Sequence, residues 1–128
     1  MLRNGILNPH ILDLLARIRH TNTLVIADRG FPFWPQIETV DISLVDDVPT
    51  VLQVLAAIVP NFTIGPIRAA AEFMTHNSPE KIAALQKLAG DRLLFEPHVQ
   101  FKQRVPHAIG LIRTSDTTPY ANLILESA

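Results

Sequence analysis

Six polar side chains of this 128-residue chain stand at the ends of predicted strands and helices, where they could take part in acid–base chemistry. Ligands of open α/β sheets bind at the carboxyl ends of the strands, so residues at such ends are candidates for a binding site. Imidazoles, carboxylates and phenols can exchange protons with a polar substrate, and an amide can hold its hydroxyl groups. The six are His20, Asp28, His98, Lys102, Tyr120 and Asn122.

The first two candidates flank an apolar run. Leu24–Ala27 has no polar interruption, which predicts a strand buried on both faces. His20 precedes this strand and Asp28 follows it directly. The pair Asn8-Pro9 predicts the start of a helix that we expect to end near Arg19–His20. The negative end of that helix dipole would favour a protonated His20, which could then donate a proton near neutral pH.

The remaining candidates lie in the C-terminal third. Pro97 predicts the start of a helix that places His98 at its second position, where the positive helix end favours a neutral imidazole. Two histidines in opposite electrostatic settings are suited to separate acid and base roles. Lys102 lies one turn after His98 on the same helix face. Tyr120 and Asn122 alternate on a predicted last strand and should point to the same side.

Each candidate also has a purely structural interpretation. A single histidine at a helix end is more often a capping residue than a catalyst, and Asp28 before Gly30 can simply form a turn. Lys102 can be a solvated side chain and Tyr120 a packing residue. The other three histidines, His10, His76 and His107, are interpreted as surface or cap residues.

The order of the predicted elements indicates a single α/β domain over residues 1–128, with three layers. Strands and helices alternate and are joined by short loops. Further helices are predicted at Pro49–Val59, from Pro79 to Gly90 and at Pro97–Arg104, and further strands at Glu38–Asp41, Arg92–Phe95, Ala108–Ile112 and Tyr120–Leu125. Thr63–Met74 is ambiguous: Ala69–Ala71 favours a helix, whereas Gly65-Pro66 and the apolar run from Ile67 favour the strand that we expect there.

Composition excludes several kinds of function. A net charge of -1 with no basic stripe argues against nucleic acid or an anionic membrane surface as the main partner. The chain has no cysteine, so disulfides and zinc–thiolate sites are excluded, and no metal-binding histidine pair or glycine-rich phosphate loop is present. Polar residues interrupt the N-terminal stretch, so we expect no signal peptide, no membrane span and a cytoplasmic location. The apolar fraction of 48% favours an oligomer.

Short motifs that run in order along the chain resemble the D-ribose pyranase / L-fucose mutarotase family. Any one of them is weak, and their combination over essentially the whole chain carries the resemblance. They are Gly5–Asn8, His20–Asp28, Gly30 with Pro32, Val48–Thr50, Ala71–Glu72, His98–Lys102, Ile112–Thr114 and Thr118–Leu125.

The resemblance implies a three-layer α/β/α fold with a mixed, mostly parallel central sheet. It implies an isomerase, without a cofactor or metal, that interconverts the ring forms of a free monosaccharide. The assembly implied is a decamer of two pentameric rings with active sites between subunits. By position His20 matches the catalytic proton donor, and the substrate-binding positions are Asp28, His98, Lys102, Tyr120, Ala121 and Asn122, with 120–122 supplied by a neighbouring subunit.

The motifs favour D-ribose as the sugar, with an L-fucose mutarotase-like activity as the second choice. His98 and Tyr120–Asn122 follow the ribose type, whereas Phe31-Pro32 is closer to the fucose type. Arg19 stands where the family has glycine, which places a positive charge beside the predicted donor. The alternative hypothesis is a non-catalytic monosaccharide-binding or regulatory subunit of a sugar uptake and catabolism system, and a third is a purely structural oligomer.

Overall fold

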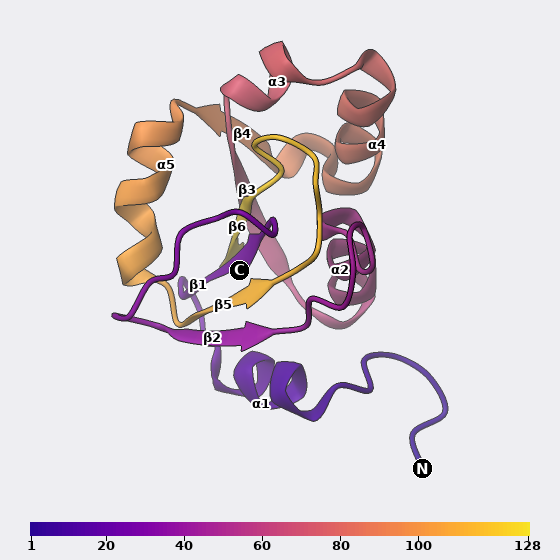
Figure 1. The fold of residues 1–128 in the computed structure, drawn as a ribbon. Coiled ribbons are helices and arrows are strands. Elements are labelled where there is room, and N and C mark those ends of the chain that lie inside the picture. Colours follow the sequence, from indigo (N-terminus) through magenta and orange to yellow (C-terminus); the bar gives the residue numbers. More distant parts are fainter.

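Six strands form one mixed sheet in the computed structural model, which describes residues 1–128 (Figure 1). The strands are β1 (Thr23–Ala27), β2 (Glu38–Asp41), β3 (Ile64–Ala70), β4 (Leu93–Glu96), β5 (Gly110–Arg113) and β6 (Leu123–Ser127). Their order across the sheet is β2-β5-β1-β6-β3-β4. Five strands are parallel to one another, and β6 runs antiparallel between β1 and β3.

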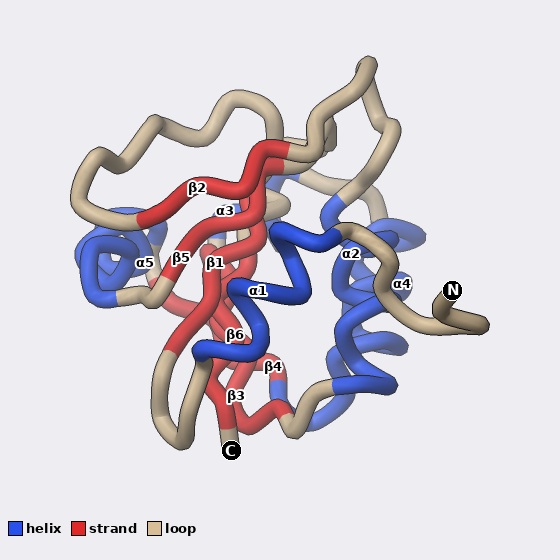
Figure 2. The backbone as a smooth tube through the Cα atoms, turned by 90° about the horizontal axis from the view of Figure 1, so that it is seen from below, coloured by secondary structure: helices blue, strands red, loops and turns tan.

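Helices cover both faces of the sheet, with α5 on one face and α1, α2 and α4 on the opposite face (Figure 2). The helices are α1 (Pro9–Arg17), α2 (Val51–Ile58), α3 (Glu72–His76), α4 (Pro79–Ala89) and α5 (His98–Arg104). Short 3₁₀ turns follow three of them at Val59–Asn61, Gly90–Arg92 and Val105–His107. The predicted three-layer α/β fold is confirmed. No helix has the length and apolar character required to cross a membrane.

Local sequence accounts for the helix starts. The Asn8 side chain accepts hydrogen bonds from the backbone N–H groups of His10 and Ile11, which caps α1. Thr50 and Gln53 form a reciprocal capping box at the start of α2, and Ser78 caps α4. Because these caps satisfy N–H groups that have no partner within the helix, the starts could be read from the sequence.

The buried strand β1 divides the core into two clusters. Leu24 and Ile26 belong to the larger cluster, under α1, α2 and α4, whereas Val25 and Ala27 face α5 in the smaller cluster. All four side chains have no exposed surface, which confirms the predicted strand buried on both faces.

Gly110 in β5 allows close packing of α1, because a Cβ atom there would lie 2.7 Å from Leu14 Cδ1.

Three predicted boundaries were wrong. The first helix ends at Arg17, so His20 lies beyond the last turn and outside the short range of the helix dipole. The predicted strand Thr63–Met74 ends at Ala70 and is followed by α3. The last strand begins at Leu123 rather than Tyr120, because Tyr120 has a φ of 57°, which no strand residue adopts.

Candidate active site

The carboxyl edge of the sheet collects the ends of the five parallel strands together with the start of β6. Asp28 directly follows β1, His98 begins α5 just after β4, and Tyr120 to Asn122 immediately precede β6. Because β6 is antiparallel, its beginning lies at the same edge as the ends of its neighbours. The structure therefore brings four of the predicted site residues together within one chain.

Asp28 and Asn122 form the floor of this cluster. The backbone N–H of Asp28 donates to Asn122 Oδ1 at 2.7 Å, and Asp28 Oδ1 accepts the N–H of Gly30 at 2.9 Å. Asn122 is buried and Asp28 half-buried. Burial raises the pKa of the Asp28 carboxyl, against hydrogen bonds from Gly30, Asn122 and Phe31 that lower it. Asp28 thus both closes a turn, as its structural interpretation predicts, and presents a carboxyl group at the sheet edge.

His98 is held in an aromatic environment. Its ring stacks on Phe101 at 6.0 Å between centroids and meets the rings of Phe31 and Tyr120 edge-on at 6.2 and 5.1 Å. Its Nδ1 atom is buried without a hydrogen-bond partner, which leaves Nε2 as the nitrogen available for exchange with a ligand. Burial, and then the charge of Lys102, lower the pKa of His98. This direction agrees with the neutral imidazole expected at this helix start, but desolvation rather than the helix dipole is its main cause.

Tyr120 occupies a turn with backbone angles that favour glycine. Its ring lies between His98 and the exposed His76, whose ring centroid is 5.0 Å away. The prediction that Tyr120 and Asn122 share one face of a strand was wrong. Both precede β6, and the left-handed turn at Tyr120 sends its ring toward His98 while Asn122 turns inward to Asp28.

The predicted proton donor His20 lies at the opposite edge of the sheet. It is exposed in the turn before β1, where the N–H of Thr21 donates to the Ser127 carbonyl at the far end of β6. The five residues of β1 separate it from Asp28 by roughly 17 Å at about 3.3 Å per residue. The Arg19 guanidinium is turned away toward the end of α1, where it donates to the Ala16 carbonyl at 2.5 Å and the Ile18 carbonyl at 3.1 Å.

The grouping within one chain differs from the one expected from the sequence. That expectation placed 120–122 on a neighbouring subunit, yet this segment joins Asp28 and His98 of its own chain. His20 is the residue that its own chain does not bring to the cluster.

The last two predicted residues lie at the margin of the cluster. Lys102 lines a surface groove with Trp34 and Val99, and acts on His98 through its charge. The buried side chain of Ala121 packs into the larger core and lines a cavity of about 270 Å³ between α2 and α4. Any contact of Ala121 with a ligand at the edge would therefore come from its backbone. No three acidic or histidine side chains converge to hold a metal ion.

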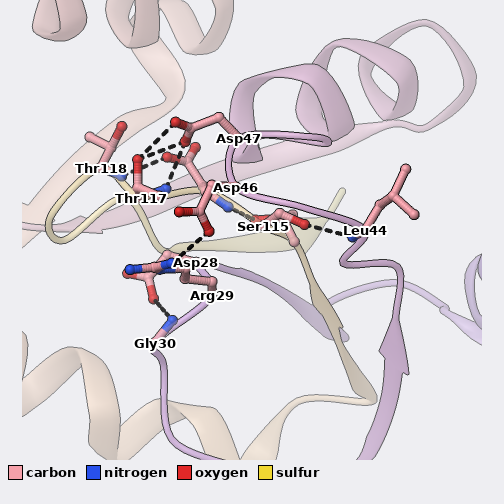
Figure 3. Close-up of polar contacts among 11 residues, drawn as sticks. Asp28, Arg29, Gly30, Leu44, Asp46, Asp47, Ser115, Thr117 and Thr118 are labelled. Carbon is pink, nitrogen blue, oxygen red and sulfur yellow. Dashed lines mark hydrogen bonds and ion pairs between the residues drawn. The ribbon is translucent and has the colours of Figure 1, made fainter.

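A polar network behind Asp28 joins two loops whose contacts the sequence did not predict (Figure 3). Asp47 accepts hydrogen bonds from the Thr117 N–H at 2.9 Å and from its hydroxyl, and Ser115 Oγ accepts the N–H of Leu44 at 2.8 Å. The buried Asp116 accepts the N–H groups of Val51 and Thr118. These contacts tie the 43–48 loop to the 114–118 loop. The only sequence signal was the density of Asp, Ser and Thr in both loops.

Comparison with known proteins assigns the chain to a family. The model of the RbsD / FucU transport protein family matches residues 1–128. The chain belongs to this family. It is 40% identical to a D-ribose pyranase of Geobacillus kaustophilus over 99% of this chain and 93% of that protein, and 41% identical to one of Chromobacterium violaceum over 99% and 97%.

The family is also evident from the fold. The structure of Bacillus subtilis RbsD complexed with D-ribose superimposes with a TM-score of 0.92 at 33% sequence identity, covering 100% of this chain and 98% of that one. The resemblance found in the sequence motifs is thereby confirmed.

Proposed function

We propose that this chain is a D-ribose pyranase that interconverts the pyranose and furanose forms of the free sugar. The observation that carries the proposal is the cluster of Asp28, His98, Tyr120 and Asn122 at the carboxyl edge of the sheet, which provides acid–base groups and hydroxyl-binding groups side by side. The pyranase relatives and the likeness to the ribose-bound RbsD support D-ribose as the substrate.

The reaction needs proton transfer and nothing more. Opening the pyranose requires a proton on the ring oxygen and removal of one from the anomeric hydroxyl, and reclosure through another hydroxyl gives the furanose. His98 is neutral near pH 7, so its Nε2 can accept the anomeric proton. Asp28 and Asn122 hold the sugar hydroxyls, and the Tyr120 phenol adds a further hydrogen-bonding group. Well-placed acid–base groups contribute about 10²–10⁴-fold to the rate.

His20 would act from a neighbouring copy of the chain as the proton donor. Hydrogen bonds to β6 and to the Asn22 side chain hold its turn, and His20 is exposed there. Contact between the His20 edge of one copy and the Asp28 edge of the next is a head-to-tail interface, and such interfaces close into rings. We extend the proposal to a decamer of two pentameric rings acting in the cytoplasm, for which light scattering gives the mass.

A non-catalytic sugar-binding subunit is the second candidate, with Arg19 as the residue that would weaken the donor. The turn of Arg19 toward the carbonyls of Ala16 and Ile18 counts against it, because the guanidinium is engaged at the end of α1.

Saturation-transfer NMR on D-ribose tests the proposal. Added protein should speed pyranose–furanose exchange, and His20→Ala should abolish the acceleration. His10→Ala is the matched control, because His10 is also exposed but lies at the start of α1. Ribose binding without faster exchange would favour the non-catalytic subunit, and absence of binding would refute both.

A further inference from the structure

The short helix α3 contacts both sides of the proposed sugar site, although none of its residues was among the predicted site residues. It follows β3, and its first residue, Glu72, reaches α5. The backbone N–H of His98 donates to both carboxylate oxygens of Glu72, at 3.0 and 3.1 Å. Ala71, just before the helix, donates its N–H to the Glu96 carbonyl at 2.7 Å, which fixes the start of α3 to the end of β4. Both contacts hold the segment that presents His98.

The other end of α3 reaches the turn that presents Tyr120. The Asn77 amide nitrogen donates to the Phe73 carbonyl at 3.0 Å and to the Pro119 carbonyl at 2.8 Å. The first bond closes the end of α3, and the second fixes the residue immediately before Tyr120. Tyr120 has a φ of 57°, a conformation that side-chain-bearing residues keep only where the surroundings hold them. The ring of His76, the last residue of α3, packs against Tyr120 as well.

We propose that Glu72 and Asn77 are positioning residues, which together make α3 a bracket that sets the distance and angle between the His98 and Tyr120 rings. The two rings face each other edge-on at 5.1 Å, and neither is fixed by a hydrogen bond of its own ring. The effect on catalysis rests on the proposed function. The arrangement of the two rings does not depend on that function.

The role of Glu72 can be separated into position and charge. Its carboxylate accepts the His98 N–H, and its charge also raises the pKa of His98 against the stronger effects of burial and Lys102. Glu72→Gln keeps an oxygen that can accept the N–H and removes the charge. Glu72→Ala removes both. Asn77→Asp keeps the shape of the side chain but loses the N–H groups that donate to Phe73 and Pro119.

The test measures ribose exchange kinetics together with a probe of the single tyrosine. We expect Glu72→Ala and Asn77→Asp to lower kcat/KM by about 10- to 100-fold, since misplaced catalytic groups of this kind cost up to about 10² in rate. Glu72→Gln should stay within about threefold of wild type, which shows rescue by the retained hydrogen bond. Met74→Ala is the control, because Met74 is an exposed residue of the same helix.

The tyrosine probe works without activity. Tyr120 is the only tyrosine of the chain, so 3-fluorotyrosine gives one ¹⁹F signal that reports the ring packing against His98. We expect this signal to move or broaden in Glu72→Ala and Asn77→Asp, and to stay unchanged in Glu72→Gln and Met74→Ala.

The outcomes distinguish this inference from the proposed function. Wild-type kinetics in Glu72→Ala and Asn77→Asp, or a loss in Glu72→Gln as large as in Glu72→Ala, would overturn the bracket while the pyranase function stands. If the wild type does not accelerate ribose exchange, the proposed function is refuted. The ¹⁹F signal alone then decides whether α3 positions the Tyr120 ring. An unchanged signal in Glu72→Ala and Asn77→Asp then refutes the bracket, and a changed one supports it.

Discussion

A shared active site predicts that two inactive variants restore activity when their subunits are mixed. His20→Ala removes an exposed side chain from a turn that is held by backbone hydrogen bonds, so the fold should be unaffected. Asp28→Asn keeps the oxygen that accepts the Gly30 N–H and removes the carboxylate. His20→Ala alone should lose about 10²–10⁴-fold in rate, the typical contribution of one acid–base group. Asp28→Asn alone should lose about 10- to 100-fold, because a hydrogen bond from a sugar hydroxyl to a charged carboxylate is replaced by a weaker one.

The magnitude of the recovery follows from the separation of the two residues. Because roughly 17 Å of β1 lies between them, His20 and Asp28 of one chain cannot act on the same sugar. In the proposed ring, each site would combine Asp28 of one copy with His20 of the next. In a random equal mixture, half of the copies keep Asp28 and half of their neighbours keep His20, so about one quarter of the sites in a head-to-tail ring are intact.

The assay is saturation-transfer NMR on D-ribose with the two variants unfolded and refolded together. About one quarter of the wild-type rate is expected, against almost none when His20→Ala is mixed with the double variant His20→Ala/Asp28→Asn. A refolded mixture that forms mixed oligomers yet stays as inactive as its components would refute the division of the site between copies.

Three further outcomes are expected. Gly110→Ala should lower the free energy of unfolding by about 1–3 kcal/mol, because its Cβ would lie 2.7 Å from Leu14 Cδ1. Unchanged urea unfolding would contradict this close packing. Tyr120→Phe should keep the edge contact with His98 and lose the phenol hydroxyl, which raises the KM for ribose by about 2- to 10-fold at nearly constant thermal stability. An unchanged KM would exclude the hydroxyl from substrate binding. The pKa of His98 is lower in the folded protein than in the unfolded chain, where it is about 6.5. Between the folded and the unfolded pKa the unfolded chain binds more protons, so the free energy of unfolding rises with pH in that range. His98→Phe should flatten the slope of melting temperature against pH, and an equal slope in both proteins would show that His98 does not contribute to it.

Local patterns in the sequence were enough for most of the elements. Asn8 and Ser78 cap helices through contacts within three residues, so they can be recognised without the fold. The apolar run Leu24–Ala27 predicted the buried central strand for the same reason. The boundary at Tyr120 could not be predicted, because its left-handed backbone conformation is held by the Asn77–Pro119 hydrogen bond, between residues 42 apart in the sequence.

The sequence by itself determined the residue types of the site and the family, through motifs that need only their order along the chain. The tertiary structure decided which of these residues meet. Because β6 runs antiparallel to β1, its beginning brings Tyr120 and Asn122 beside Asp28, while His20 is left at the other edge. Strand direction depends on which strands pair, and pairing is a contact between distant residues that no local pattern encodes. That direction places Tyr120 to Asn122, and not His20, beside Asp28 within one chain, which is why the proposed site takes His20 from a neighbouring copy.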